Sequence, residues 1–274
     1  MKIHRVIGLG VLLAGAGIHV AGAQPSFQLF SQAAEDSDQD DDVAAAEQQD
    51  AAAMYALGQM FDEGLGITAD ARAAFQWYDR AASRGHLEAM NRLGILYAQG
   101  RGVTRDYAAA LEWYRRAATQ GSLTAVKNIA TMYFYGFGIP QDYSQAAKLL
   151  EGAANQGDAD AQNKLGAMYN DGLGLAQDHE QARDLFRRAA AQGYPPALVN
   201  LGRMYTEAIG VKRDDLHGYA LIQAGIDKGV PTSMYELAHS ELRAAAARLS
   251  PQQLARAQGM ATQLSRTSTA AKFG

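Results

Sequence analysis

The sequence of 274 residues contains no cysteine. It can therefore form no disulfide and carry no lipid on an N-terminal cysteine, so its stability must come from packing alone. It also lacks a long hydrophobic run. The most apolar stretch, Val6 to Ile18, includes four glycines and is shorter than the roughly 20 residues that a membrane-spanning helix needs.

Patterns that would indicate an enzyme are also missing. No serine is followed by lysine three residues later, and neither G-x-S-x-G nor G-x-x-x-x-G-K-[ST] occurs. The six histidines share no short metal-ligand spacing. His179 and Glu180 begin a zinc-helix pattern, but Arg183 stands where the second histidine must be. We predict no catalytic residue, no metal site and no cofactor.

The first 23 residues resemble a secretory signal peptide. Lys2 and Arg5 precede the apolar run, and Ala21-Gly22-Ala23 forms a small-x-small cleavage site. We therefore expect cleavage after Ala23 and a periplasmic or secreted protein. The alternative, a membrane anchor, is disfavoured by the short glycine-containing run.

Residues 24–50 are predicted to form an acidic, disordered linker. They contain eight acidic residues and no basic one: Glu35, Asp36, Asp38, Asp40, Asp41, Asp42, Glu47 and Asp50. Few large apolar residues are present, so burial cannot offset the entropy of ordering the chain. The short cluster of Phe27, Leu29 and Phe30 could still dock on the rest of the protein.

An alternative interpretation of this stretch is a calcium loop. Five acidic residues, Asp36, Asp38, Asp40, Asp42 and Glu47, match ligand positions 1, 3, 5, 7 and 12 of such a loop. However, Asp41 occupies the position that needs glycine for a sharp turn.

The rest of the chain, residues 51–274, has a net charge of +2. It shows no cluster of basic residues of the kind that binds nucleic acid.

One unit repeats along the chain. Similar segments begin at Ala53, Ala89, Ala125, Ala161 and Ala197, at a constant interval of 36 residues. Position 5 of each repeat is aliphatic, position 6 is small and position 9 is aromatic, which indicates a helix, termed helix A, with one packing face. Paired glycines such as Gly100 and Gly102 are predicted to end it.

A second helix, helix B, is predicted in each repeat. It begins after an aspartate N-cap and carries a small, large, small stripe at i, i+4 and i+8. The caps are Asp70, Asp106, Asp142, Asp178 and Asp214. Gln145 and Gln181 are placed to complete a capping box, and the glycines Gly85, Gly121, Gly157, Gly193 and Gly229 are expected to end the helices.

The pattern A-x-x-x-L-G-x-x-Y-x-x-G-x-G-V-x-x-D-x-x-x-A-x-x-W-Y-x-x-A-A-x-x-G resembles the Sel-one-like repeat (SLR), a relative of the tetratricopeptide repeat. The resemblance covers Ala53 to Gly229 and extends more weakly beyond it. It implies an all-α, right-handed superhelical solenoid that binds proteins, usually without chemistry of its own.

A sixth, atypical repeat is predicted to cap the solenoid, which would occupy residues 51–266. Ser250 and Gln253 form a capping box for its helix B, with Pro251 at the first helical position. Ala244 to Ala246 replace the loop glycines, so helix A should run on for a turn or more. Residues 267–274 are expected to be a disordered tail.

Partner binding is predicted on the helix A face at positions 3, 7 and 10, which vary between repeats. The candidate residues are Asn91, Lys127, Thr131, Phe134, Asn163, Asn170 and Arg203. Asparagines could bond an extended peptide backbone, Phe134 could anchor an apolar side chain, and Arg203 could bind a carboxylate.

We predict a non-catalytic periplasmic adaptor that binds a protein or peptide in its concave groove, in signalling or in envelope or secretion assembly. No nucleic acid and no membrane span are expected after signal cleavage. The resemblance also leaves open a secreted virulence or immunity factor, and a β-lactamase-like or cell-wall hydrolase, although the β-lactamase-like members are cysteine-rich. The oligomeric state is not predicted.

Overall fold

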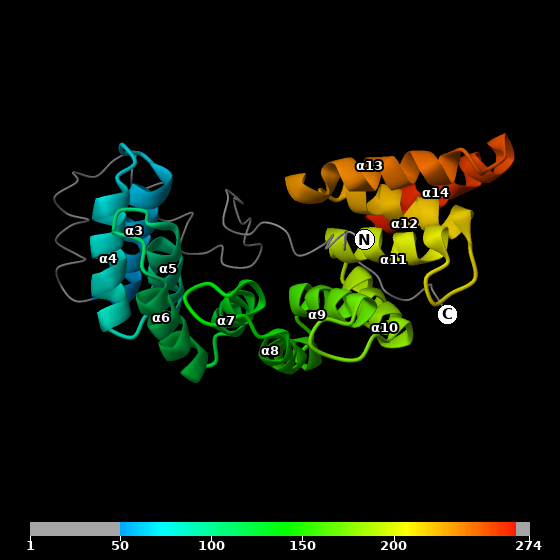
Figure 1. The fold of residues 1–274 in the computed structure, drawn as a ribbon. Coiled ribbons are helices and arrows are strands. Elements are labelled where there is room, and N and C mark those ends of the chain that lie inside the picture. The colour runs from blue at the N-terminus through cyan, green and yellow to red at the C-terminus, as the bar shows by residue number, and fades with distance from the viewer. Residues whose placement is uncertain (1–49, 267–274) are drawn as a thin grey trace. The chain divides into compact units, whose positions relative to one another are not determined.

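The computed structural model describes residues 50–266 (Figure 1). Within this range all twelve elements are α-helices, and they divide between two compact units that we describe separately. The N-terminal unit, residues 50–141, contains α3 (Ala51–Glu63), α4 (Ala71–Ser83), α5 (Leu87–Gln99), α6 (Tyr107–Thr119) and α7 (Leu123–Tyr135). The C-terminal unit, residues 142–266, contains α8 (Tyr143–Asn155), α9 (Ala159–Asp171), α10 (His179–Ala191), α11 (Pro195–Glu207), α12 (Asp215–Asp227), α13 (Thr232–Ala246) and α14 (Pro251–Arg266).

The predicted all-α repeat fold is confirmed. Helices α3 to α12 each have 13 residues and alternate between helix A and helix B, and equivalent helices begin 36 residues apart. The predicted signal peptide, the linker with its calcium alternative, and the tail fall on residues 1–49 and 267–274. Those predictions lie outside the described residues.

Glycine ends helix A as predicted. Gly64, Gly100, Gly136 and Gly172 are left-handed, with φ between 67° and 73°. The same turn is made by Ala208 in repeat five, the one non-glycine residue of range 50–266 with positive φ, at 58°. A Cβ in this conformation costs about 1–2 kcal/mol, so repeat five keeps the turn against local strain.

Aspartate caps helix B in each of the first five repeats as predicted, but the capping boxes expected at Gln145 and Gln181 are only half formed. Asp142 and Asp178 accept hydrogen bonds from the backbone N–H groups of Gln145 and Gln181, at 2.9 and 3.0 Å. The backbone N–H of Asp178 donates instead to the carbonyl of Tyr169 at 2.9 Å. The cap therefore ties helix B to the end of helix A, an arrangement that a local motif does not reveal.

The sixth repeat departs from the others in the way the sequence indicates. Ser250 and Gln253 form both hydrogen bonds of a capping box, at 2.9 and 3.3 Å. Helix α13 extends to Ala246, three residues or just under one turn beyond the equivalent of Glu207. Helices α13 and α14 both pack on α12, so this repeat covers the apolar face of repeat five.

The core of each repeat depends on a small residue that lies against a large one. An added Cβ on Gly94 would lie 2.3 Å from the Tyr114 ring, and one on Gly58 would lie 2.5 Å from the Tyr78 ring. The backbone of helix A, at position 6 of the repeat, is therefore in direct contact with the ring of helix B, at position 26 of the repeat.

Position 8 of the repeat was not predicted to be a core position. It is nevertheless buried at Leu96, Met132, Met168 and Met204, whereas the predicted aromatic position 9 is half-buried.

We predict that Gly94→Ala and Tyr114→Leu are energetically coupled. The added methyl must displace the Tyr114 ring, and overpacking of this kind costs about 1–3 kcal/mol. A smaller leucine relieves the clash, and repeat three already carries Ala130 and Leu150 at these two positions. Urea unfolding of both single variants and the double variant should show that the double variant is more stable than additivity predicts, by about 1 kcal/mol or more. Additive changes in the free energy of unfolding would contradict the contact.

His86 gives the N-terminal unit a pH-dependent helix cap. Its Nδ1 accepts a hydrogen bond from the backbone N–H of Ala89 at 3.3 Å, which requires the neutral imidazole. Burial lowers the pKa of His86, and this effect outweighs the opposing charges of Glu88 and Asp50. The cap is therefore complete above the unfolded-state pKa, and its contribution is lost as the pH falls below it.

Replacement by serine provides the test, because Ser122 caps α7 in the same way through a hydrogen bond from Ala125. Between pH 7.5 and pH 5.5 the parent should lose more unfolding free energy than His86→Ser, by a few tenths to about 1 kcal/mol. Thermal or urea unfolding at both pH values measures the difference. Parallel pH dependence of the two proteins would mean that His86 does not act as a titrating cap.

Candidate protein-binding face

All seven predicted binding residues lie on A helices, and they fall into two groups. Asn91 lies on α5, and Lys127, Thr131 and Phe134 lie on α7, all in the N-terminal unit. Asn163, Asn170 and Arg203 lie on α9 and α11 in the C-terminal unit. The two groups are therefore described separately, and their role in partner binding stays a prediction.

In the N-terminal unit, two of the four residues are interior. Asn91 is 8% exposed and its Nδ2 donates to Ser122 Oγ at 2.8 Å. Phe134 is 4% exposed and meets Tyr135 edge-on, with ring centroids 4.9 Å apart. Thr131 is half-buried and donates to the carbonyl of Lys127 at 2.9 Å. The exposed part of this group is thus smaller than the sequence pattern suggests.

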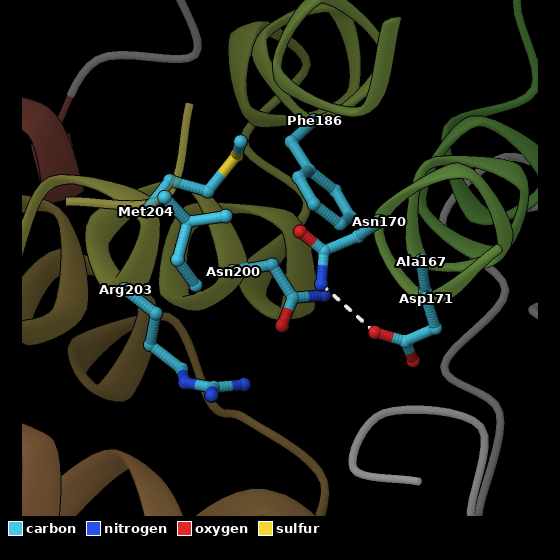
Figure 2. A pocket seen from close by; sticks show the side chains of 8 residues that line it. Ala167, Asn170, Asp171, Phe186, Asn200, Arg203 and Met204 are labelled. Carbon is cyan, nitrogen blue, oxygen red and sulfur yellow. Dashed lines mark hydrogen bonds between the residues drawn. The ribbon is translucent and has the colours of Figure 1, made fainter. Parts of the chain in front are cut away.

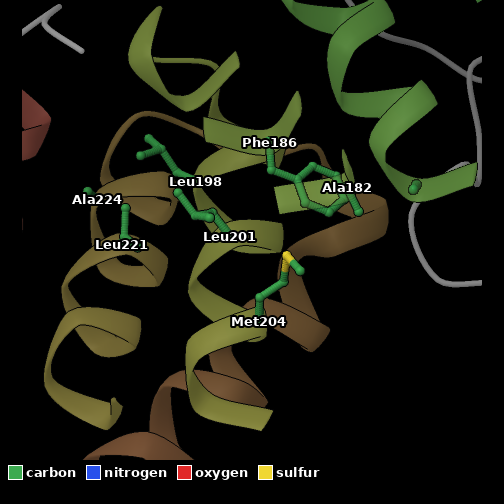
Figure 3. Packing of buried hydrophobic residues seen from close by; sticks show 8 residues of the cluster. Ala182, Phe186, Leu198, Leu201, Met204, Leu221 and Ala224 are labelled. Carbon is green, nitrogen blue, oxygen red and sulfur yellow. The ribbon is translucent and has the colours of Figure 1, made fainter. Parts of the chain in front are cut away.

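In the C-terminal unit, Asn170 and Arg203 line one pocket of about 60 Å³ (Figure 2). The complete lining is Ala167, Asn170, Asp171, Phe186, Asn200, Arg203, Met204 and Ile209. Phe186 and Met204 also belong to the hydrophobic core of this unit, where Figure 3 shows them with Leu201 and Leu221. The pocket therefore has an apolar floor that rests on the core and a rim of amide and charged groups.

Hydrogen bonds hold Asn170, at the end of α9, in place at the rim of the pocket. Asn170 Nδ2 donates to Asp171 Oδ1 at 2.9 Å, the contact drawn in Figure 2. The Asn170 backbone carbonyl accepts from Gln177 Nε2 at 2.7 Å, and its Oδ1 lies 3.2 Å from His179 Nδ1. These contacts fix the direction of the amide, so a partner would meet a preorganised polar edge.

Arg203 is already paired with carboxylates. Its guanidinium donates to Glu207 at 3.1 Å and lies 4.0 Å from Glu241. Burial and the nearby charge of Glu207 raise the pKa of Glu241, even though Arg203 opposes that shift. Because Arg203 is shared between two acids, the predicted role of binding a partner carboxylate would require it to leave at least one of them.

Asn200 was missed by sequence reasoning. Its Nδ2 donates to Asn163 Oδ1 at 2.9 Å, which joins position 4 of repeat five to position 3 of repeat four. Asn163 is 3% exposed, so this predicted residue serves stacking between repeats. A signal was present, because position 4 varies and is mostly polar: Ala56, Arg92, Asn128, Lys164 and Asn200.

The N-terminal unit also has asparagines at positions 3 and 4 of consecutive repeats, but they do not form this hydrogen bond. Asn128 and Asn91 correspond to Asn200 and Asn163, and the buried Asn91 Oδ1 and Asn128 Nδ2 make no hydrogen bond. They are an acceptor and a donor, and they occupy the positions that bond in the other unit. The asparagines at positions 3 and 4 therefore lie where adjacent repeats contact each other, and this contact takes precedence over a role in partner binding.

The described residues offer no cluster of three or more histidine, aspartate or glutamate side chains that could hold a metal ion. Across residues 50–266, no helix is both long enough and apolar enough to cross a membrane. The pocket brings together two amides, one carboxylate and one ion-paired guanidinium on an apolar floor. Such a surface can recognise a side chain and its polar surroundings.

Solved structures with a similar fold include several repeat proteins. A protective antigen of uropathogenic Escherichia coli with an SLR fold gives a TM-score of 0.73 at 28% identity, over 81% of this chain and 47% of that chain. This chain thus spans about half the length of that antigen. A Sel1 repeat protein from Oxalobacter formigenes gives 0.66 at 28% identity, over 78% of this chain and 88% of that chain.

An immunity protein from Pseudomonas aeruginosa gives a TM-score of 0.53 at 21% identity, over 80% of this chain and 83% of that chain. At this identity the likeness shows the fold alone. No curated protein matches this chain.

The family model described as Sel1 repeat matches five consecutive segments: residues 51–86, 87–122, 125–158, 159–194 and 195–230. These segments follow the five helix pairs from α3 to α12 and cover well over half of the chain. Their boundaries agree with the repeated caps and glycine turns. The protein therefore belongs to the Sel1 repeat family, whose members are generally protein-interaction scaffolds and typically non-catalytic.

Proposed function

We propose that this chain is a non-catalytic adaptor that holds a segment of a partner protein against its helix A face. The pocket formed by α9, α10 and α11 carries the proposal. Its rim residues Asn170 and Arg203 occupy positions 10 and 7, which differ in every repeat while the framework positions stay similar. Residues that vary on a constant backbone are available for recognition.

The charges around the pocket indicate the kind of segment that fits. Asp171 lines the pocket, Glu207 and Glu241 lie beside Arg203, and the guanidinium of Arg248 also acts on Glu241. An apolar side chain can fill the space above Phe186, and a neighbouring lysine or arginine of the partner can pair with Asp171 at the rim. We therefore infer a partner segment with an apolar residue next to a basic one.

We further propose that the adaptor acts in the periplasm after removal of residues 1–23, on the basis of the predicted signal peptide. Fractionation of cells that express the full chain, followed by intact-mass measurement, provides the test. The periplasmic fraction should contain a protein that begins at Gln24. Recovery only in the culture medium would favour the second candidate, an exported factor, which the likeness to an antigen at 28% identity also supports. An uncleaved cytoplasmic product would contradict both.

Partner binding can be tested by filling the pocket. Ala167→Ile places at position 7 the residue that repeat two already carries there, Ile95. Because Ala167 is 6% exposed and packs in the core of this unit, thermal unfolding must first show that the variant is as stable as the parent. The branched side chain would occupy the space above Phe186 and weaken binding by about tenfold or more, equivalent to about 1.4 kcal/mol. Crosslinked capture from the periplasmic fraction identifies the partner, and titration calorimetry with the purified partner measures the affinity.

Arg187→Ala is the matched control, because Arg187 lies on helix B with an exposed side chain and pairs only with Asp184 among the contacts described. The control should bind as the parent does. Equal binding by the parent and Ala167→Ile would place the partner elsewhere on the chain. Failure of the parent to capture any protein would argue against an adaptor in this compartment.

A further inference from the structure

The first helix of the array, α3, exposes part of a face that the later repeats bury. Position 1 of the repeat is alanine in repeats one to five, and it is 0% exposed in four of them: Ala89, Ala125, Ala161 and Ala197. Ala53, the same residue in repeat one, is partly exposed. Position 8 lies about two turns further along this face, and Met60 is also partly exposed there, whereas its equivalents in repeats two to five are at most 4% exposed. Among the described residues, no helix therefore covers this face of α3 as fully as its equivalents are covered.

In repeats two to five, helix A packs on helix B of the repeat before it, in the pairs α4 with α5, α6 with α7, α8 with α9 and α10 with α11. One turn joins the two helices in all four cases. The backbone N–H of the helix A N-cap donates to the carbonyl of the alanine at position 29 of helix B, at 3.1–3.2 Å. The pairs are His86 with Ala81, Ser122 with Ala117, Asp158 with Ala153 and Tyr194 with Ala189. These alanines are at most 1% exposed, so position 29 belongs to the contact between repeats.

The residues before α3 match the end of a helix B, in register with the repeats. Asp50 is the N-cap of α3, and it lies 36 residues before His86, the N-cap of α5. Residues 45–50 (A-A-E-Q-Q-D) match residues 117–122 (A-A-T-Q-G-S) at both alanines and at the glutamine, and each segment ends in the N-cap of the next helix. Ala45 therefore falls at position 29, directly before the helix whose face is left open.

The same register shows that this helix B cannot have its full length. Ala182 and Phe186 of α10 form one apolar cluster with Met204, at position 8 of the next helix A. The residues that correspond to Ala182 and Phe186 before α3 are Asp38 and Asp42. A carboxylate at such a contact would lose its hydration without a partner. Residues 38–42 are therefore unsuited to cover Met60, whereas Asp42 is suited to be the N-cap of a short helix that begins at Val43.

We propose that residues 43–49 form the end of a helix B that packs on the first turn of α3 and covers Ala53, with the Asp50 N–H bonded to the carbonyl of Ala45. A helix of about two turns is not stable alone in water, so this contact with α3 is what orders it. The sequence patterns alone assign these residues to the acidic linker, and the proposal gives its last part a place in the array. The segment also occupies part of the face on which a second copy could stack. The inference does not rest on the pocket of the C-terminal unit.

One residue departs from the repeated turn. The residue before the helix A N-cap is a glycine with φ between 75° and 92° in repeats one to four: Gly85, Gly121, Gly157 and Gly193. Gln49 stands at the equivalent position. Because a side chain is disfavoured in this conformation, Gln49→Gly should strengthen the turn if it forms.

Hydrogen exchange of the full chain, read by mass spectrometry, tests the proposal. Ala45→Arg places a charge at position 29, which is buried in repeats one to four. The matched control, Ala44→Arg, places the same residue at position 28, which is exposed in those repeats and already holds Arg80, Arg116 and Arg188. The two variants share the added charge and side chain and differ only in the side of the helix that carries them.

The amides of residues 50–57 report on the start of α3. Ala45→Arg should speed their exchange by about fivefold or more, because loss of the docked segment lets the first turn open. Ala44→Arg should exchange as the parent does, and Gln49→Gly should slow exchange by about threefold or more. Residues 86–93, at the start of α5, are the internal reference, and their exchange should be the same in all four proteins.

Equal exchange of residues 50–57 in Ala45→Arg and Ala44→Arg would overturn the proposal, because an undocked chain does not distinguish the two positions. Unchanged exchange in Gln49→Gly would also overturn it, and this variant keeps the test valid if Ala45→Arg disturbs residues 86–93 as well. An Ala45→Arg effect that grows with protein concentration would mean that the segment covers α3 of a second copy, and the intramolecular assignment would be wrong. None of these outcomes bears on the Ala167→Ile test in the other unit.

Discussion

The contact on which the repeats depend is that between a small residue of helix A and a large side chain of helix B. At Gly94 and Tyr114 the backbone of one helix touches the ring of the other, and Gly166 and Phe186 repeat the arrangement in the C-terminal unit. A methyl group at the glycine would move the helices apart. The distance between helices A and B is therefore set by these pairs, and the position of the next repeat follows from it.

Contacts between repeats use the side chains that vary. Tyr194 at the start of α11 donates to Asp160 on α9 at 2.9 Å, and Gln192 at the end of α10 donates to the carbonyl of Gly157 in repeat three at 2.9 Å. Asn200 and Asn163 form a third such bond. Polar residues at non-framework positions therefore stabilise the array, and only some of the residues that vary remain accessible for recognition. Because each repeat contacts only its neighbours, the loss of one of these hydrogen bonds should weaken only the interface between the two repeats that it joins.

Positions outside the framework differ in chemistry because the repeats differ in composition. The pocket over Phe186 is lined by Asp171, two asparagine amides and the ion-paired Arg203. Tyr107 of repeat two and Phe137 of repeat three instead join their repeats by stacked rings, with centroids 5.4 Å apart. One framework can therefore carry different side chains at equivalent positions, since position 10 is Asn170 in one repeat and Phe134 in another. This is the usual way in which function is added to a repeat fold.

The sequence by itself determined the repeat, the helices and nearly all their ends. Asp caps and left-handed glycines act within a few residues, so a local pattern is sufficient to predict them. The tertiary structure decided which residues of the predicted binding face are accessible. Asn91, Asn163 and Phe134 proved to be buried, and Arg203 is occupied by Glu207. Exposure and ion pairing depend on what the adjacent repeat places opposite a side chain, and spacing along one helix carries no information about that neighbour.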